Sequence, residues 1–187
     1  GLDGLRALAV AAVLLYHHDP RLLPGGFLGV ELFFVLSGYL ITALLFFEWR
    51  AFGALDLAGF WLRRARRLVP AMLVMLLACL AIGALFLRDQ LAELRGDTLA
   101  ALAYLANWRL ILEQRPYFAS FGRPSLLLHL WSLAIEEQFY LVWPTLLVLA
   151  RPRRAFGLCA GLIALVVIWR LIDSAAGLTA SWPIYVD

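Results

Sequence analysis

Long apolar runs, separated by short polar segments, dominate the chain. Five of these runs approach the roughly 20 helical residues that are needed to cross the ~30 Å hydrocarbon layer of a membrane. They cover residues 2–20, 27–47, 68–87, 126–150 and 155–172. A helix that is apolar on most of its surface suits lipid, so the pattern predicts an all-α, polytopic integral membrane bundle.

A shorter segment, residues 97–112, begins at Asp97 and contains Arg109. Its length leaves two alternatives open, a membrane span or a helix at the membrane surface. Arginine-rich loops favour the cytoplasmic side, and the densest are RRARR at residues 63–67 and RPRR at residues 151–154. The third and fourth runs supply two crossings between these loops. We therefore expect residues 97–112 to lie at the outer surface or to re-enter the membrane.

The composition agrees with a membrane protein. Hydrophobic residues make up 64% of the 187 residues, and the mean hydropathy is +0.85, which exceeds what a soluble core needs. The formal net charge is +3. The arginines of the chain stand at the ends of apolar runs rather than along an exposed polar face, which argues against nucleic acid as a partner. The two cysteines lie within apolar runs, and we expect no metal site.

The first run carries Arg6 near one end and His17 near the other. These residues are eleven positions apart, and eleven helical steps return to within roughly 20° of the same face. His18 is rotated by about 100°, so His17 is the facial partner of Arg6. One interpretation is that both polar residues anchor the ends of the span in the headgroups. The other is that His17 is a general base in a cavity, a task that its near-neutral pKa range suits.

A polar stripe begins the fourth run. Helical geometry places its members within about 60° of arc on one face. They are His129, Ser132, Glu136 and Tyr140. The adjacent acids Glu136 and Glu137 are costly inside a membrane unless they face protein, water or a basic partner. They predict either a structural pairing with an arginine from another helix or a site that binds substrate or orients a catalytic histidine.

The segment FWLRRARRLVP, residues 60–70, joins an aromatic pair to four arginines. On a helix, Arg63, Arg64 and Arg67 cluster on one side, whereas Arg66 points elsewhere. A cytoplasmic anchor at the lipid headgroups has this appearance. So does a phosphate-binding patch, because arginine forks match phosphate oxygens.

Four segments together resemble the membrane-bound acyltransferase family 3, whose members O-acylate carbohydrates and related acceptors. They are LDGLRALAVAAVLLYHH, GGFLGVELFFVLSGYLI, FWLRRARRLVP and HLWSLAIEEQFYLVWP. Arg6 and His17 fit the family's signature of an arginine, ten residues and a histidine, whereas Glu31 stands where aspartate is usual and Tyr39 where phenylalanine is usual. The family has roughly ten membrane helices, so five runs are expected to form the N-terminal half of such a domain.

The resemblance implies transfer of an acyl group, most often acetyl, from acyl-coenzyme A to a hydroxyl across the membrane. The acceptor is expected to be a cell-envelope carbohydrate or a lipid-linked glycan, and the location the plasma (inner) membrane. The donor is a substrate, so no tightly bound cofactor is expected. A soluble domain that receives the acyl group is a possible partner beyond this chain.

The resemblance also assigns roles to individual residues. It makes His17 the catalytic histidine and Arg6 the residue that organises the donor or the helix. A sugar hydroxyl is a poor nucleophile, so a base that removes its proton during attack on the thioester supplies what the reaction lacks. It further implies that Arg63, Arg64 and Arg67 bind phosphates of coenzyme A, and that Glu136 and Glu137 line the acceptor pocket or orient a catalytic group.

Two other classes of protein fit the same polar stripes. Intramembrane arginine, histidine and glutamate also line pathways in transporters and flippases. A transporter does not need a cytoplasmic phosphate patch beside a histidine-bearing helix, and this patch distinguishes it from the acyltransferase. An inactive membrane scaffold is the third class.

Overall fold

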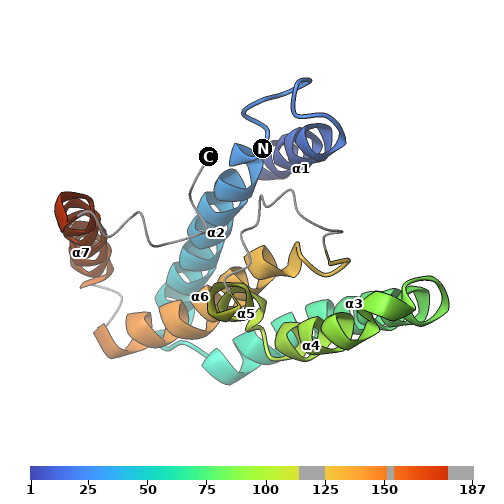
Figure 1. Ribbon diagram of the computed structural model, residues 1–187. Helices are drawn as coiled ribbons and strands as arrows, with labels where there is room; N and C mark the ends of the chain where they lie inside the picture. The colour runs from blue at the N-terminus through green and yellow to red at the C-terminus, as the bar shows by residue number, and fades with distance from the viewer. Residues whose placement is uncertain (114–124, 151–153, 177–187) are drawn as a thin grey trace. The chain divides into compact units, whose positions relative to one another are not determined.

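The computed structural model describes residues 1–113, 125–150 and 154–176. Within these residues, seven α-helices and one short 3-10 helix follow one another without a strand, which confirms the predicted all-α class (Figure 1). Their bounds are α1 Leu2–His18, α2 Leu28–Phe52, α3 Leu57–Phe86, η1 Arg88–Gln90, α4 Leu91–Leu102, α5 Ala106–Leu112, α6 Leu130–Ala150 and α7 Ala155–Ala176.

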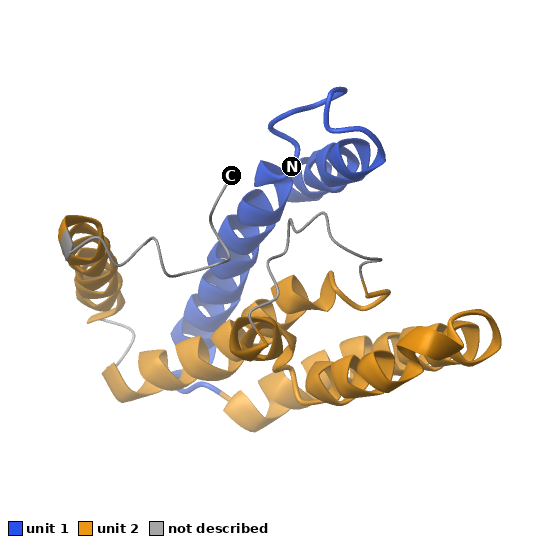
Figure 2. Ribbon diagram, viewed as in Figure 1, with its two compact units in different colours: residues 1–55 blue, residues 56–187 orange. Residues whose placement is uncertain are grey.

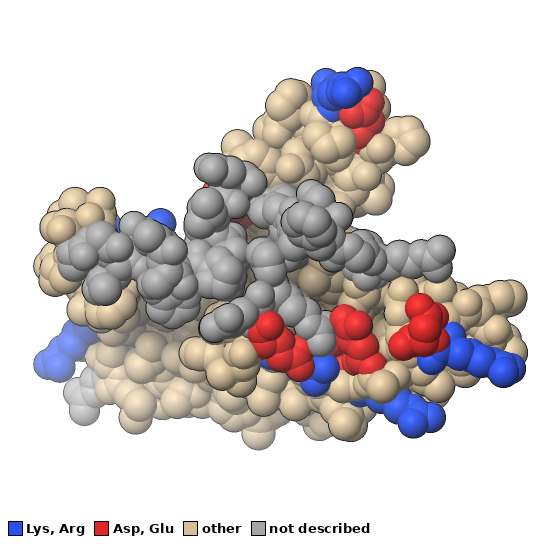
Figure 3. All heavy atoms as spheres, viewed as in Figure 1, with Lys and Arg blue, Asp and Glu red and all other residues tan. Residues whose placement is uncertain are grey.

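Four helices of the described residues, α2, α3, α6 and α7, are long and apolar enough to cross a membrane. They coincide with the second to fifth predicted runs. Helix α1 has 17 residues, so its crossing of a membrane stays a prediction. Figure 3 shows charged side chains gathered at a few places, with broad uncharged surface between them on the face drawn. Because many large apolar side chains are exposed along these helices, lipid is the solvent that suits them.

The chain divides into two compact units, residues 1–55 and 56–187 (Figure 2). Unit 1 consists of α1 and α2, which pack closely because Gly29 has no side chain. A Cβ atom at Gly29 would lie 2.5 Å from the Ala9 carbonyl oxygen and 2.7 Å from Cγ2 of Val13. Helix α2 ends at Gly53, whose φ of 71° is the left-handed conformation that glycine adopts without strain.

Unit 2 begins with a capped helix. The Asp56 carboxylate accepts a hydrogen bond from the Gly59 N–H at 2.9 Å and so starts α3 well before the apolar run at residues 68–87. The arginine-rich segment is therefore the first part of the same helix, and Pro70 lies inside it. Hydropathy marks only the part of a helix that suits lipid, which is why the predicted run is shorter than α3.

The core of unit 2 joins α3, α4 and the segment before α6. Gly83 permits this approach, since a Cβ there would lie 2.5 Å from Cδ2 of Leu94. The buried members of this core are Met72, Leu76, Leu94, Ala101 and Leu127.

Residues 97–112 do not form one helix. They are divided between α4 and α5 by a turn at Tyr104, whose φ is 53°. Such a break is invisible to a hydropathy pattern. A location at the outer surface stays a prediction, as does the cytoplasmic RPRR loop, of which residues 151–153 lie outside the described residues.

Candidate functional site

His17 is exposed near the end of α1. Its Nδ1 atom lies 2.8 Å from the Val13 carbonyl oxygen, one helical turn earlier. A carbonyl only accepts hydrogen bonds, so Nδ1 carries the proton in the neutral ring and Nε2 keeps its lone pair. The ring edge also meets the Tyr16 ring, with the centroids 5.6 Å apart. This geometry presents His17 in the tautomer that a general base needs.

Arg6 lies on the same helix, three turns before His17. Its side chain is partly buried, and its Nε atom is buried without a hydrogen-bond partner in the part of the chain that the structure describes. A buried guanidinium nitrogen without a partner is costly. Arg6 is thus suited to a partner such as a bound substrate or another part of the protein.

The segment GGFLGVELFFVLSGYLI, which resembles the second of the four family motifs, lies against α1, the helix that carries His17. Gly26 and Gly29 both meet α1 backbone, at the Ala12 and Ala9 carbonyl oxygens respectively. Glu31, the departure from the family pattern, is exposed in the first turn of α2, where a carboxylate is favoured by the helix dipole. The close helix contact therefore holds the turn of α1 that orients His17.

Arg64 and Glu137 form the most enclosed ion pair between two long helices of unit 2. Nε and one terminal nitrogen of Arg64 donate to the same Glu137 oxygen, Oε1, at 3.0 and 2.9 Å. The side chains are only 22% and 14% exposed. The guanidinium also lies over the Tyr140 ring, 3.2 Å from its centroid. This contact links α3 to α6 across 73 positions of sequence.

Glu136, the glutamate directly before Glu137, contacts a different neighbour. The Tyr140 hydroxyl donates a hydrogen bond to Glu136 Oε1, and the Ser132 hydroxyl donates to the His129 carbonyl at 3.1 Å. Bonds along α6 therefore connect the four members of the predicted stripe pairwise. Glu136 and Glu137, adjacent in sequence, are held by separate partners.

A proline explains another contact between the same two helices. Pro144 has no N–H, so it cannot donate the usual helical hydrogen bond to the carbonyl of Tyr140 four residues earlier. Trp61 Nε1 donates to that carbonyl instead, at 3.0 Å. Trp61, which belongs to the aromatic pair before the arginines, thereby provides the Tyr140 carbonyl with the hydrogen bond that Pro144 cannot donate.

The predicted phosphate ligands separate into two kinds. Arg64 is turned toward Glu137, whereas Arg63 and Arg67 are exposed. Arg63 lies 3.8 Å from the exposed carboxylate of Asp56, a weak surface pair. The structure thus pairs Glu137 with an arginine from another helix, which is one of the two alternatives that the sequence left open, whereas the family resemblance assigns Arg64 and Glu137 to different roles.

The site residues fall into both units. Arg6 and His17 belong to unit 1, and the arginines of α3 and the glutamates of α6 belong to unit 2. Each unit holds its own set of polar contacts. The predicted roles of these residues stay predictions.

Three further polar residues lie beside the Arg64–Glu137 pair and were not singled out from the sequence. Gln138 Nε2 donates to the Tyr104 carbonyl at 2.7 Å and to Oδ1 of Asn107 at 3.0 Å. Burial and the charge of Glu137 raise the pKa of the Tyr104 phenol, and the charge of Arg64 opposes this shift. The signal available in the sequence was the position of Gln138 directly after the two glutamates.

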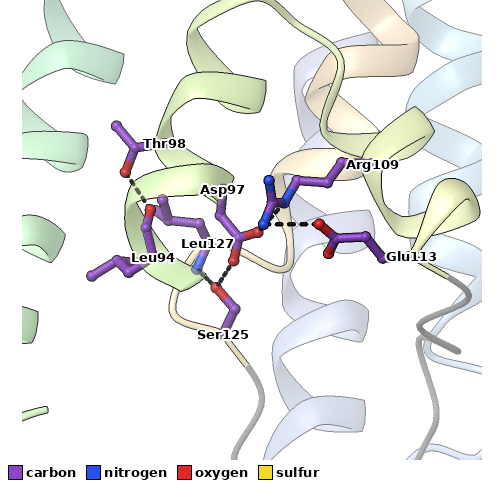
Figure 4. Close-up of polar contacts among 7 residues, drawn as sticks. All are labelled: Leu94, Asp97, Thr98, Arg109, Glu113, Ser125 and Leu127. Carbon is purple, nitrogen blue, oxygen red and sulfur yellow. Dashed lines mark hydrogen bonds and ion pairs between the residues drawn. The ribbon is translucent and has the colours of Figure 1, made fainter. Parts of the chain in front are cut away.

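A second polar cluster stabilises the turn between α4 and α5 (Figure 4). Asp97 accepts hydrogen bonds from Arg109 Nε at 2.8 Å and from the Ser125 hydroxyl at 2.5 Å. Arg109 also pairs with Glu113 at 2.9 Å, and the Ser125 oxygen accepts from the Leu127 N–H at 3.2 Å. The cluster fixes the segment that leads into α6 and so supports the position of its glutamates.

Comparison with known proteins gives this geometry a context. A family model described as an acyltransferase domain matches residues 1–187. No solved structure matches the chain.

Three relatives illustrate the similarity. The peptidoglycan O-acetyltransferase of Listeria monocytogenes is 45% identical over 189 aligned residues, which cover 98% of this chain and 30% of that protein. A provisionally named peptidoglycan O-acetyltransferase of Bacillus subtilis is 51% identical over 79% of this chain and 23% of its own length. A provisionally named O-acetyltransferase of Staphylococcus aureus is 47% identical over 79% of this chain and 24% of its own length. The chain spans less than a third of each of these relatives.

Proposed function

Because the chain belongs to this acyltransferase family, we propose that the protein of which it is part transfers an acetyl group to a hydroxyl of peptidoglycan. The relatives' names supply the acceptor and the acyl group. The donor that we propose is acetyl-coenzyme A, delivered from the cytoplasmic side of the plasma membrane. In this reaction a C–O bond to the acceptor forms and the C–S bond of the thioester breaks, and a base takes the hydroxyl proton and passes it to the departing thiolate of coenzyme A.

The orientation of His17 carries the proposal. With Nδ1 donating to the Val13 carbonyl, Nε2 is the nitrogen that would take the proton of the acceptor hydroxyl as it attacks the thioester. Arg6 supplies a positive charge on the same helix face, three turns from His17, where a phosphate of the donor would be stabilised.

The arginines of α3 support a role in binding the donor. Arg63 and Arg67 are exposed one helical turn apart, so both guanidinium groups can reach phosphates of one coenzyme A molecule. Arg64 acts differently in this proposal, because it holds Glu137 in place. Glu136 and Glu137 then serve the acceptor, or orient the group that activates it.

Two variants of neighbouring histidines test the base. The full-length protein is expressed in cells that lack peptidoglycan O-acetylation, and the acetate released from their purified peptidoglycan by alkali is measured. We expect His17→Ala to lower this acetate by about 100-fold or more, because general base catalysis contributes roughly that factor. His18→Ala, the matched control on another helix face, is expected to stay near wild type.

The outcomes separate the parts of the proposal. Absence of acetylation by the wild-type protein would overturn the function and favour a transporter half or a scaffold. Full acetylation by His17→Ala would leave the function standing and remove His17 as the base.

A second pair of variants tests the donor site. Loss of one charge-assisted phosphate contact weakens binding by about tenfold or more, so Arg67→Ala should raise KM for acetyl-coenzyme A by that factor. Arg66→Ala removes an equally exposed arginine from another direction and should leave KM unchanged. If KM for acetyl-coenzyme A were the same in Arg67→Ala and Arg66→Ala, this result would contradict a phosphate site on the face of α3 that carries Arg67.

A further inference from the structure

Tyr140 lies in the contact between α3 and α6, and both its side chain and its backbone are held there. Only 2% of the residue is exposed. Its carbonyl accepts the hydrogen bond from Trp61 Nε1 at 3.0 Å, which ties this turn of α6 to α3. The aromatic ring therefore has a fixed place within unit 2.

Two groups of opposite charge contact this one ring. The guanidinium of Arg64 lies over its face, 3.2 Å from the centroid, where the ring attracts a cation. The hydroxyl at its edge donates a hydrogen bond to Oε1 of Glu136, and a carboxylate is a strong acceptor. Tyr140 thus connects a cation of α3 with an anion of α6.

The same guanidinium holds the other glutamate of α6. Arg64 donates to Glu137 Oε1 at 3.0 and 2.9 Å while it covers the Tyr140 ring. A continuous series of contacts therefore runs from Glu137 through Arg64 and Tyr140 to Glu136. One series of contacts sets the positions of both carboxylates, although the two residues are adjacent and project in different directions from the helix.

Glu136 gains most from such a contact. It is only partly buried, and a glutamate side chain reaches its surroundings through several rotamers, most of which would misplace its carboxylate. The Tyr140 side chain has fewer rotatable bonds and is enclosed, so its hydroxyl offers a fixed point of attachment. A group that binds substrate or orients another group needs support of this kind.

We propose that Tyr140 is a positioning residue, whose hydroxyl holds the Glu136 carboxylate in the orientation that serves the acceptor. This inference rests on the proposed function, in which Glu136 serves the acceptor or orients the group that activates it. Tyr140 is enclosed within unit 2, so it acts through Glu136 and not on the substrate itself.

The first measurement compares two tyrosine-to-phenylalanine changes in the full-length protein. Tyr140→Phe removes the hydroxyl and keeps the ring that Arg64 covers, so it isolates the bond to Glu136. We expect kcat/KM for the peptidoglycan acceptor to fall by about tenfold, the effect of one hydrogen bond to a charged group, with KM for acetyl-coenzyme A unchanged. The matched control is Tyr39→Phe, because Tyr39 is 60% exposed on α2 and its variant should keep both constants.

A double-variant cycle separates positioning from general support of the fold. Glu136→Ala removes the carboxylate, so the Tyr140 hydroxyl then has nothing to position. We expect Glu136→Ala to lower kcat/KM for the acceptor by at least about tenfold, and Glu136→Ala/Tyr140→Phe to have the same value. If the hydroxyl only supported the fold, its effect would multiply with that of Glu136→Ala.

Three results would overturn the inference. They are wild-type kcat/KM in Tyr140→Phe, wild-type kcat/KM in Glu136→Ala, and a further loss of about tenfold in the double variant. Absence of transfer by the wild-type protein would instead overturn the proposed function.

A second variant applies if Tyr140→Phe does not accumulate in the membrane. Glu136→Asp keeps the charge and the tyrosine, and its shorter side chain withdraws the carboxylate from the hydroxyl. A loss of about tenfold for the acceptor, with KM for acetyl-coenzyme A unchanged, then supports the inference. Wild-type kinetics of Glu136→Asp overturn it.

Discussion

The neutral form of the Tyr104 phenol is favoured by burial and by Glu137, and this has a consequence for stability. The pKa of the folded state is raised above the ordinary value of 10.0. The folded protein then binds more protons than the unfolded chain between these two pKa values, so its stability falls as the pH rises through that interval. Below pH 10.0 the contribution of this group is fully present.

Thermal unfolding of the purified protein in detergent, measured from pH 8 to pH 11, should therefore show a steeper loss of stability for wild type than for Tyr104→Phe. Tyr39→Phe should follow the wild-type curve, because it keeps the Tyr104 phenol. Parallel curves for wild type and Tyr104→Phe would contradict the assigned environment of this phenol.

Glu137 was found from the sequence, and its neighbour Gln138 was not. Glu137 is costly in a membrane and so draws notice in any apolar run. Gln138 has no charge and so costs less than a glutamate, although it stands in the same motif. Its role arises from the Tyr104 turn, 34 positions away, and no local pattern indicates that contact.

The contact between α1 and α2 depends on glycine. At Gly29 an added Cβ would meet the Ala9 carbonyl oxygen at 2.5 Å, and a backbone atom cannot turn aside as a side chain can. We expect Gly29→Ala to push the two helices apart and to cost about 1–3 kcal/mol of stability. Thermal unfolding in detergent measures this loss, and acetyl transfer should fall with it because Val13, which orients His17, faces the same contact.

Gly25→Ala is the matched control for Gly29→Ala. The nearest atom to its added Cβ would be Cδ1 of Leu28 at 3.9 Å, an ordinary contact. Stability and activity should therefore match wild type. Equal stability of both glycine variants would show that α1 and α2 approach less closely than described here.

The ion pair between Arg64 of α3 and Glu137 of α6 leads to a prediction about stability. Arg64→Met leaves Glu137 without its partner in an enclosed place and should destabilise the protein by about 3 kcal/mol or more. The double variant Arg64→Met/Glu137→Met removes the uncompensated charge and should recover most of that stability. Acetyl transfer should stay low in both, since Glu137 is lost or misplaced. A single variant as stable as wild type would contradict the pairing.

Helix existence was predictable here, and helix ends were not. Apolar length located α2, α3, α6 and α7, because lipid-facing helices must be apolar over about 20 residues. The start of α3 depends on the Asp56 cap, and the division at Tyr104 depends on a hydrogen bond from α6. Both are polar contacts that do not alter the mean hydropathy of a segment.

The predicted site residues lie partly in unit 1 and partly in unit 2. Periodicity placed Arg6 and His17 on one helix face, since both belong to one helix. It could not pair Arg64 with Glu137, because that contact joins two helices and residues 73 positions apart. The chain spans less than a third of its relatives' length, so further residues of the site are expected from the rest of the protein.

The arginines predict the direction in which the chain crosses the membrane. If the RRARR segment of α3 is cytoplasmic, then α2 brings the chain inward, and the turn between α1 and α2 lies outside. His17 then lies near the outer surface, where the acceptor is, and the exposed arginines lie where acetyl-coenzyme A is made. The proposed reaction requires this arrangement, so the orientation is a direct test of it.

Single cysteines report the orientation. In a background with Cys79→Ser and Cys159→Ser, a membrane-impermeant maleimide applied to intact cells should label Gly25→Cys and leave Arg66→Cys unlabelled. Both positions are exposed within their units, so access to the reagent decides the result. Arg66→Cys should become labelled once the membrane is permeabilised, which excludes a hidden thiol. Labelling of Arg66→Cys in intact cells would reverse the orientation and place the arginines of α3 on the side where no coenzyme A is available.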